Sequence, residues 1–274
     1  IAACALPRIF DEVHPTHALV YNPLYPTNRV FWELALQRGV KGISISTGGF
    51  VPNRAGTLAI YPHLSASQTL VDSQTVMESM STPCSPEEIQ ATERHLRSLM
   101  AGHDPWVYSS APTGSQEDEI REKVGVAPGR RVVLALVASP DETRSSELVD
   151  AEFVRVPGHD LSDVQEFVRT SVDFGERNPD LDVVIRLHPR LSPNKRERIT
   201  SPDLEPIQRI LKSRPSNVHV NAPGDGVGLY DVMRIADVGL NQSSSSGLEL
   251  LVHGIPVVHY DPPRMNAYPT HLGL

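Results

Sequence analysis

The segment that most constrains the fold is residues 236–260, which read as a strand, a turn, a helix, a turn and a second strand. Asp237–Leu240 is short and apolar, as a buried parallel strand requires. Leu248–Val252 supplies the apolar positions of a short helix that Gly254 ends, and Val257–Tyr260 is the next strand. Because a helix connects the two strands, we expect them to lie parallel in one α/β sheet.

A polar run of small side chains, Asn241–Ser246, joins the first strand to the helix. The first N–H groups of a helix have no partner within it and its dipole is positive there, so such a place suits an anion. Serine hydroxyls add donors, and a glycine lets a ligand approach the backbone. Plain helix capping by serine fits the same pattern. The residues concerned are Ser243, Ser244, Ser245, Ser246 and Gly247, with Glu249 one turn further on.

The second half of the chain continues this alternation. A turn at residues 128–131 precedes an uninterrupted apolar run, 132–137, which is typical of the first buried strand of a domain. Further strands are expected at 181–187 and 218–220, and helices at about 161–178, 204–213 and 230–236. The pattern predicts a doubly wound parallel sheet, and we place a Rossmann-like domain at residues 129–274.

The first half, residues 1–128, is expected to be a partial second domain of the same Rossmann-like type. Residues 1–20 hold a loop with proline and histidine, and strands at 18–21 and 41–46 flank a helix that begins at Thr27. Residues 50–86 lack periodicity and are expected to be irregular, and helices follow at 85–100 and 117–124. Both ends of the chain look cut, so we expect a piece of a longer protein with a truncated N-terminal domain.

Composition narrows the function classes. The chain has 274 residues with 25 basic and 33 acidic side chains, a net charge of −8, which argues against a general nucleic-acid binder. Cys4 and Cys84 are far apart and have no metal-type spacing. No apolar run approaches the roughly 18 residues of a membrane span, and no signal peptide is recognisable. A cytoplasmic protein is the expectation.

Three polar clusters each follow a predicted strand: Asp141–Glu142, His188–Pro189–Arg190 and Asn241–Ser246. In a doubly wound sheet all three point to the same edge. A histidine, an arginine and serine hydroxyls form a donor set for a phosphate or diphosphate, and Glu249 could accept bonds from ribose hydroxyls. Each cluster alone has a plainer interpretation. His188 could cap its own loop, Arg190 could be a solvated charge, and Asp141–Glu142 could begin a helix.

These motifs carry a resemblance. Four segments resemble the carboxyl-terminal domain of GT-B glycosyltransferases of the capsule and lipopolysaccharide type. They are Ile185–Pro189, Tyr230–Met233 with Ala236–Asp237, Ser245–Glu249 and Gly254–Val258. The His-Pro and Ser-Ser steps are similar to those of enzymes that use CMP-activated sugars, such as sialyl- and Kdo-transferases. The resemblance implies that His188 and the serines hold the nucleotide phosphate. It covers mainly residues 132–262, and Asn22–Gly49 resembles the end of the acceptor-side domain, with Asn22, Gly48 and Gly49 at its turns.

The resemblance implies transfer of a sugar from a nucleotide donor to a growing bacterial surface polysaccharide or glycolipid, at the inner face of the membrane. Asp141 or Glu142 would serve as base or nucleophile. The donor is a substrate, and no cofactor or essential metal is expected. Three alternatives stay open: a non-hydrolysing UDP-sugar 2-epimerase, a CDP-glycerol-type polyol-phosphate transferase, and a non-catalytic sugar-nucleotide-binding domain. A serine hydrolase is disfavoured because no G-x-S-x-G elbow follows a strand.

Overall fold

The computed structural model describes residues 2–21, 23, 26–46, 58–61, 82–103, 108, 111–139, 164–194, 198–242 and 244–259. Among these, residues up to His95 belong to one compact unit and residues from Leu96 onward to another. The boundary predicted after residue 128 stays a prediction. By contacts, residues 96–128 group with the second unit, because Leu99, Ile120 and Val124 lie in its hydrophobic core.

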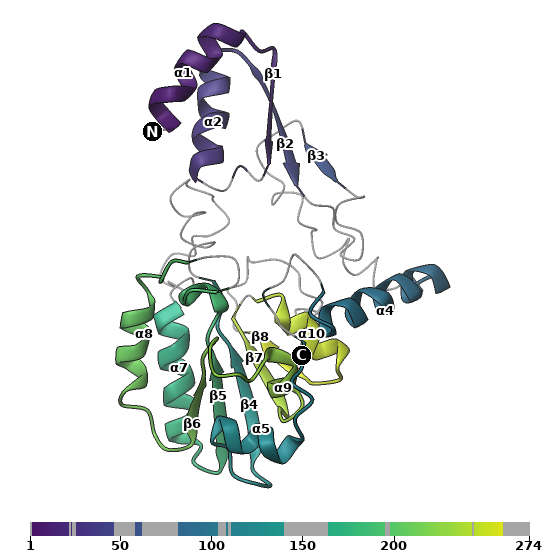
Figure 1. Cartoon of the computed structure of the whole chain (residues 1–274), viewed down its shortest axis with the longest axis vertical. Helices are drawn as coiled ribbons and strands as arrows, with labels where there is room; N and C mark the ends of the chain where they lie inside the picture. The colour runs from purple at the N-terminus through teal and green to yellow at the C-terminus, as the bar shows by residue number, and fades with distance from the viewer. Residues whose placement is uncertain are drawn as a thin grey trace. The chain divides into compact units, whose positions relative to one another are not determined.

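The first unit contains a three-stranded sheet in the order β1-β2-β3. Strands β1 (His17–Tyr21) and β2 (Lys41–Ser46) are parallel, and β3 (Ala59–Tyr61) runs antiparallel to β2. Helices α1 (Ala2–Val13) and α2 (Pro26–Gln37) pack on one face of this sheet (Figure 1). The opposite face includes Tyr21, which is exposed.

Two elements of this unit were not predicted. The loop expected over residues 1–20 is wrong for residues 2–13, which form α1 in spite of Pro7. A proline lowers helix stability, but Leu6 and Phe10 lie one turn apart and pack into the cluster formed with α2, so tertiary contacts outweigh it. Strand β3 lies in the segment expected to be irregular, and its three residues are too few to show periodicity.

The second unit is the predicted α/β domain, with five parallel strands in the order β6-β5-β4-β7-β8. Its strands are β4 (Arg131–Leu136), β5 (Leu181–Arg186), β6 (Val218–Asn221), β7 (Val238–Asn241) and β8 (Val257–His259). Its helices are α5 (Glu117–Val124), α7 (Val164–Arg177), η2 (Pro189–Leu191), α8 (Leu204–Leu211), α9 (Leu229–Met233) and α10 (Ser246–Val252) (Figure 1). Helix α4 (Pro86–Met100) precedes them.

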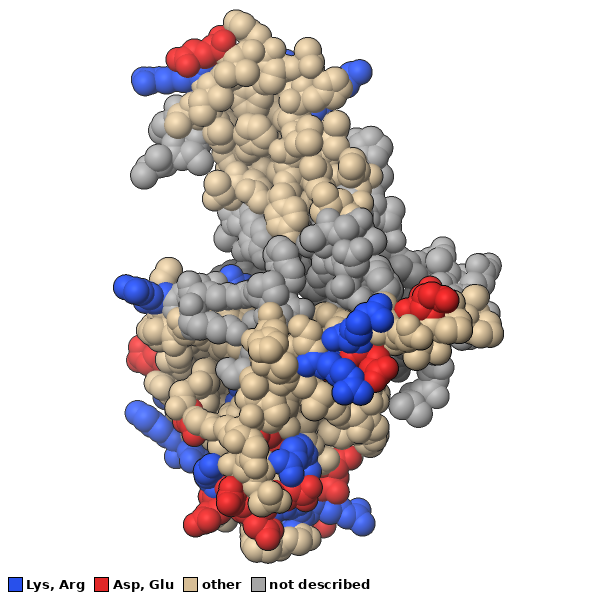
Figure 2. Space-filling view, turned by 45° about the vertical axis from the view of Figure 1, so that its right-hand side comes forward, with Lys and Arg blue, Asp and Glu red and all other residues tan. Residues whose placement is uncertain are grey.

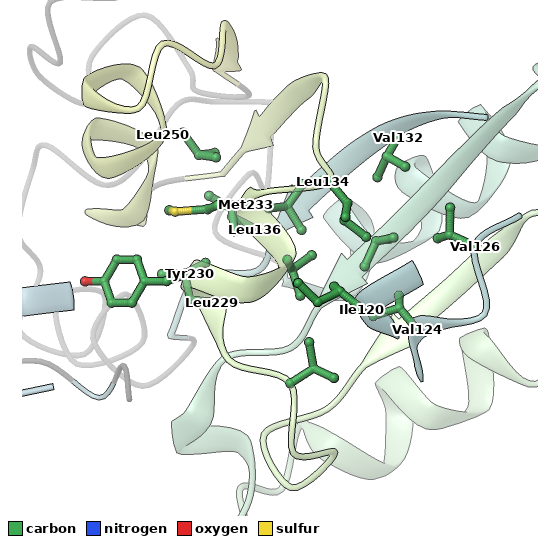
Figure 3. Close-up of a cluster of buried hydrophobic side chains, with 14 of the residues drawn as sticks. Ile120, Val124, Val126, Val132, Leu134, Leu136, Leu229, Tyr230, Met233 and Leu250 are labelled. Carbon is green, nitrogen blue, oxygen red and sulfur yellow. The ribbon is translucent and has the colours of Figure 1, made fainter. Parts of the chain in front are cut away.

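Helices cover both faces of the five-stranded sheet, as a parallel sheet requires. One face carries Leu134 and Val184, which pack with residues of α5, α9 and α10 in the cluster that Figure 3 shows. The other face carries Ala135 and Ile185, which pack with α7 and α8. Alternate residues of β4 therefore enter two separate cores, which explains the unbroken apolar run that predicted this strand.

The charged side chains of the described residues do not form a broad field of one sign on the face shown in Figure 2. Acidic and basic groups lie interspersed over the lower end of that view. Mixed charge of this kind offers no continuous basic track for a phosphate backbone. None of the helices that the structure describes is long and apolar enough to cross a membrane.

Candidate functional site at the carboxyl edge of the five-stranded sheet

The strand order places a topological switch point between β4 and β7. From β4 the chain adds β5 and β6 on one side, and β7 and β8 follow on the other. In open α/β sheets the crevice outside the carboxyl ends of such strands is where ligands bind. His188 and Arg190 come directly after β5, and Ser244–Ser246 follows β7. The structure thus brings these segments to one edge of one sheet.

The serine segment is held in place by the side chain of Asn241, the last residue of β7. Its Oδ1 accepts a hydrogen bond from the Ser244 N–H at 3.1 Å, and its Nδ2 donates to the Ser244 carbonyl at 3.0 Å. The same Nδ2 lies 3.2 Å from Nδ1 of His259 on β8. Since Asn241 is 1% exposed, this clamp lies beneath the segment and fixes its backbone.

Gly247 is required by close approach to the same clamp. A Cβ atom at this position would lie 2.8 Å from Cγ of Asn241, closer than two carbon atoms can pack. The glycine therefore lets the first turn of α10 rest on the Asn241 side chain. The structure thus gives Gly247 a packing role. The predicted role of Gly247 in admitting a ligand stays a prediction.

Capping explains one serine of the segment and not its neighbour. The Ser244 hydroxyl accepts a hydrogen bond from the Ser246 N–H at 3.3 Å. Ser245 stands at the N-cap position of α10, but its side chain makes no capping bond and is exposed. Helix α10 has seven residues, so it is too short for its dipole to be the main attraction for an anion. Donors in the segment would have to come from hydroxyls and individual N–H groups.

His188 does cap its own loop, as the plainer interpretation proposed. Its Nδ1 accepts a hydrogen bond from the Arg190 N–H at 3.2 Å, and Pro189 opens the short helix η2. A neutral imidazole that accepts at Nδ1 carries its hydrogen on Nε2 and donates there. The ring stands edge-on to Tyr108 with 5.8 Å between centroids, and it is half-buried. The cap therefore fixes both the tautomer and the orientation of a donor at this edge.

Arg186, the last residue of β5, is a half-buried cation that sequence reasoning missed. Its Nη1 donates to Oδ1 of Asn221 and to the Val227 carbonyl, the latter at 3.0 Å. Desolvation lowers the pKa of this guanidinium to about 10, and the charges of Asp225 and Asp231 act in the opposite direction. Arg186 remains charged near neutral pH, so it holds the loop between β6 and α9 by charge-assisted bonds.

Gln242 links the two strands that flank the switch point. Its Oε1 accepts a hydrogen bond from the Ala138 N–H, just beyond the end of β4, at 3.4 Å. The side chain is 4% exposed, so the bond is made inside the protein. No sequence signal pointed to this residue, because its partner lies 104 positions away.

The carboxylate of Glu249 accepts a hydrogen bond from a tyrosine. The hydroxyl of Tyr230 on α9 donates to Oε2 of Glu249 at 2.7 Å. Next to Tyr230, the buried Asp231 accepts bonds from the N–H groups of Thr113 and Gly228, at 2.9 and 3.0 Å. Asp231 therefore ties the segment before α5 to the start of α9, while Tyr230 reaches α10. The two neighbouring residues of α9 therefore connect this helix to different parts of the domain.

Six predicted site residues lie outside the described residues: Asn22, Gly48, Gly49, Asp141, Glu142 and Ser243. Their roles stay predictions. Within the described ranges, no group of three or more His, Cys, Asp or Glu side chains could hold a metal ion. Arg190 is half-buried, and neither Arg190 nor His188 is without a partner.

Three solved structures illustrate what the chain is similar to. KpsC of Thermosulfurimonas dismutans, a beta-Kdo 2,4 transferase, aligns with a TM-score of 0.43 and 15% identity over 89% of this chain. MnaA of S. aureus, solved together with UDP, aligns with a TM-score of 0.35 and 13% identity over 93% of this chain. A UDP-N-acetylglucosamine 2-epimerase aligns with a TM-score of 0.35 and 11% identity over 98% of this chain.

The chain spans 68% of the length of KpsC and 61% of each of the other two chains. No protein-family model matches the chain. No curated protein matches it either.

Proposed function

We propose that this chain is part of a GT-B glycosyltransferase that takes a sugar from a nucleotide donor, a CMP-sugar in the first instance. The observation that carries the proposal is the position of His188 and Ser244–Ser246 at one carboxyl edge, on either side of the β4–β7 switch point. That edge is the ligand side of an open α/β sheet. The motif resemblance described above supplies the reaction class and the preference for CMP.

The phosphate of the donor would lie between the two polar segments. His188 offers its Nε2 hydrogen, in an orientation set by the bond from the Arg190 N–H. Arg190 adds a positive charge, and Ser243, Ser244, Ser245 and Ser246 add hydroxyl donors. As the bond to the sugar breaks, negative charge develops on the leaving nucleotide, and donors already in position stabilise it.

The remaining roles follow the residue types. Glu249 would accept bonds from the ribose hydroxyls. Asp141 or Glu142 would act on the acceptor hydroxyl as base, or on the anomeric carbon as nucleophile. Asn22, Gly48 and Gly49 would line the acceptor side. We propose that the reaction needs no cofactor or metal, and that the acceptor is a polysaccharide or glycolipid at the inner face of the membrane.

The test is product formation from one labelled donor. The protein is incubated with a CMP-sugar or UDP-sugar labelled in the sugar, with and without an oligosaccharide acceptor. Label transferred only when acceptor is present supports the proposal. Epimerised sugar without acceptor would indicate the 2-epimerase reaction instead, and transfer of a polyol phosphate from CDP-glycerol the teichoic-acid type. Nucleotide binding without any product would leave a sugar-nucleotide-binding domain.

A further inference from the structure

Tyr230 combines a buried ring with a hydroxyl at the rim of the core. The residue is 3% exposed and belongs to the cluster between the sheet and α5, α9 and α10. Figure 3 shows its ring at the edge of that cluster, with the hydroxyl directed away from the other labelled side chains. A buried ring has few rotamers, so packing alone determines where the hydroxyl oxygen lies.

The hydroxyl acts on the one acidic side chain in the first turn of α10. Its bond to Oε2 of Glu249 is 2.7 Å long and charge-assisted, which makes it stronger than a neutral hydrogen bond. Glu249 is half-buried and has three rotatable bonds, so a hydrogen bond of this kind restrains a side chain with several rotamers. A carboxylate has about four lone-pair positions, and Tyr230 occupies one.

Packing of the core needs only the ring of Tyr230. Leu250, the next residue of α10, is fully buried in the same cluster and already anchors the helix. A phenylalanine ring would fill the space of the tyrosine ring equally well. The polar end of Tyr230 therefore serves the carboxylate, at the start of the helix that follows the serine segment.

We infer that Tyr230 is a positioning residue: by orienting Glu249 it makes the site select nucleotides that carry ribose hydroxyls. The inference rests on the proposed function, and it adds the element of the fold that sets donor specificity. Its consequence is that the hydroxyl of Tyr230 affects the affinity for a ribonucleotide and leaves the affinity for the dideoxy form unchanged.

The experiment compares two ligands on four proteins. Dissociation constants of CMP and of 2′,3′-dideoxy-CMP are measured by calorimetry for wild type, Tyr230→Phe, Glu249→Gln and Tyr21→Phe, and again with UDP and its dideoxy form. Tyr21→Phe is the matched control, the same chemical change on β1 of the first unit. Thermal midpoints of all four proteins verify folding.

We expect wild type and Tyr21→Phe to prefer the ribonucleotide, and Glu249→Gln to lose that preference. Tyr230→Phe should reduce the preference about three- to tenfold, less than the loss of a hydrogen bond to a charged group because Glu249 itself remains, with dideoxy binding unchanged. Equal weakening of both ligands by Tyr230→Phe, or an unchanged preference, would overturn the inference while nucleotide binding stands. No binding of either ligand to wild type would overturn the proposed function, and this inference with it.

Discussion

The two sides of the carboxyl edge use the same row of the sheet in opposite ways. In register, Asn221, Arg186, Leu136, Asn241 and His259 lie side by side across the five strands. On the β5–β6 side, Arg186 and Asn221 turn inward and bind a carbonyl of the following loop. On the β7–β8 side, Asn241 supports a segment whose Ser245 is exposed. Polar residues of one row thus bind one loop to the protein and leave part of another segment exposed to solvent.

The largest loss of stability is expected when the hydrogen bonds of Arg186 on the β5–β6 side are removed. Arg186→Met removes a half-buried cation and leaves the Asn221 and Val227 oxygens without its hydrogen bonds. A hydrogen bond from a charged donor is worth about 1.5–3 kcal/mol, so the loss of both should lower the free energy of unfolding in urea by about 3–5 kcal/mol. Arg209→Met is the control, because Arg209 is exposed and forms an ion pair with Glu205 at the surface of α8. A change below about 1 kcal/mol for Arg186→Met would contradict the closed network.

The next largest loss of stability is expected when the hydrogen bonds of Asn241 on the β7–β8 side are removed. Asn241→Asp keeps the shape but cannot donate to the Ser244 carbonyl or to His259 Nδ1. An unpaired buried carbonyl and a buried carboxylate together should cost about 2–3 kcal/mol of unfolding free energy, and CMP affinity should fall with them. Asn178→Asp is the matched control, since the Asn178 side chain donates a hydrogen bond to the Phe174 carbonyl at the end of α7. If the two variants lose the same stability, Asn241 is not a clamp.

The smallest effect separates two neighbouring serines. Ser244→Ala removes the acceptor of the Ser246 N–H and should lower the unfolding free energy by about 0.5–1 kcal/mol. Ser245→Ala removes an exposed hydroxyl with no capping bond, so stability should stay within about 0.5 kcal/mol while CMP affinity falls a few-fold. Urea unfolding and calorimetry on both variants decide this. Unchanged CMP affinity in Ser245→Ala would limit the segment to helix capping.

Sequence reasoning succeeded where burial leaves a local signal. Strands β4, β5 and β6 of the second unit were predicted to within one residue, and for β4 the signal was an unbroken apolar run, because its residues are buried on both faces. The polar clusters after them followed from the strand assignments. Helix α1 was missed because its cause is tertiary packing against α2 in spite of Pro7.

The residues that organise the site were harder to find. Gln242 bonds to Ala138 across 104 positions, Arg186 to Asn221 across 35, and Tyr230 to Glu249 across 19. A single sequence contains no signal for such pairs, since each depends on strand order and register. The placement of the polar segments at the carboxyl edge could therefore be predicted from where strands end, whereas the side chains that hold these segments became visible only in the folded sheet.

The measurement that tests the central claim most directly is the binding of CMP to wild type and to His188→Ala. Thermal unfolding and calorimetry detect this binding. CMP at about 100 times its dissociation constant should add about 2.7 kcal/mol to the stability of the wild-type protein. His188→Ala should bind CMP at least about tenfold more weakly, the loss of one hydrogen bond to a charged phosphate. Equal binding by the two proteins, or no stabilisation of wild type by CMP, CDP, UDP or GDP, would contradict a nucleotide site at this edge.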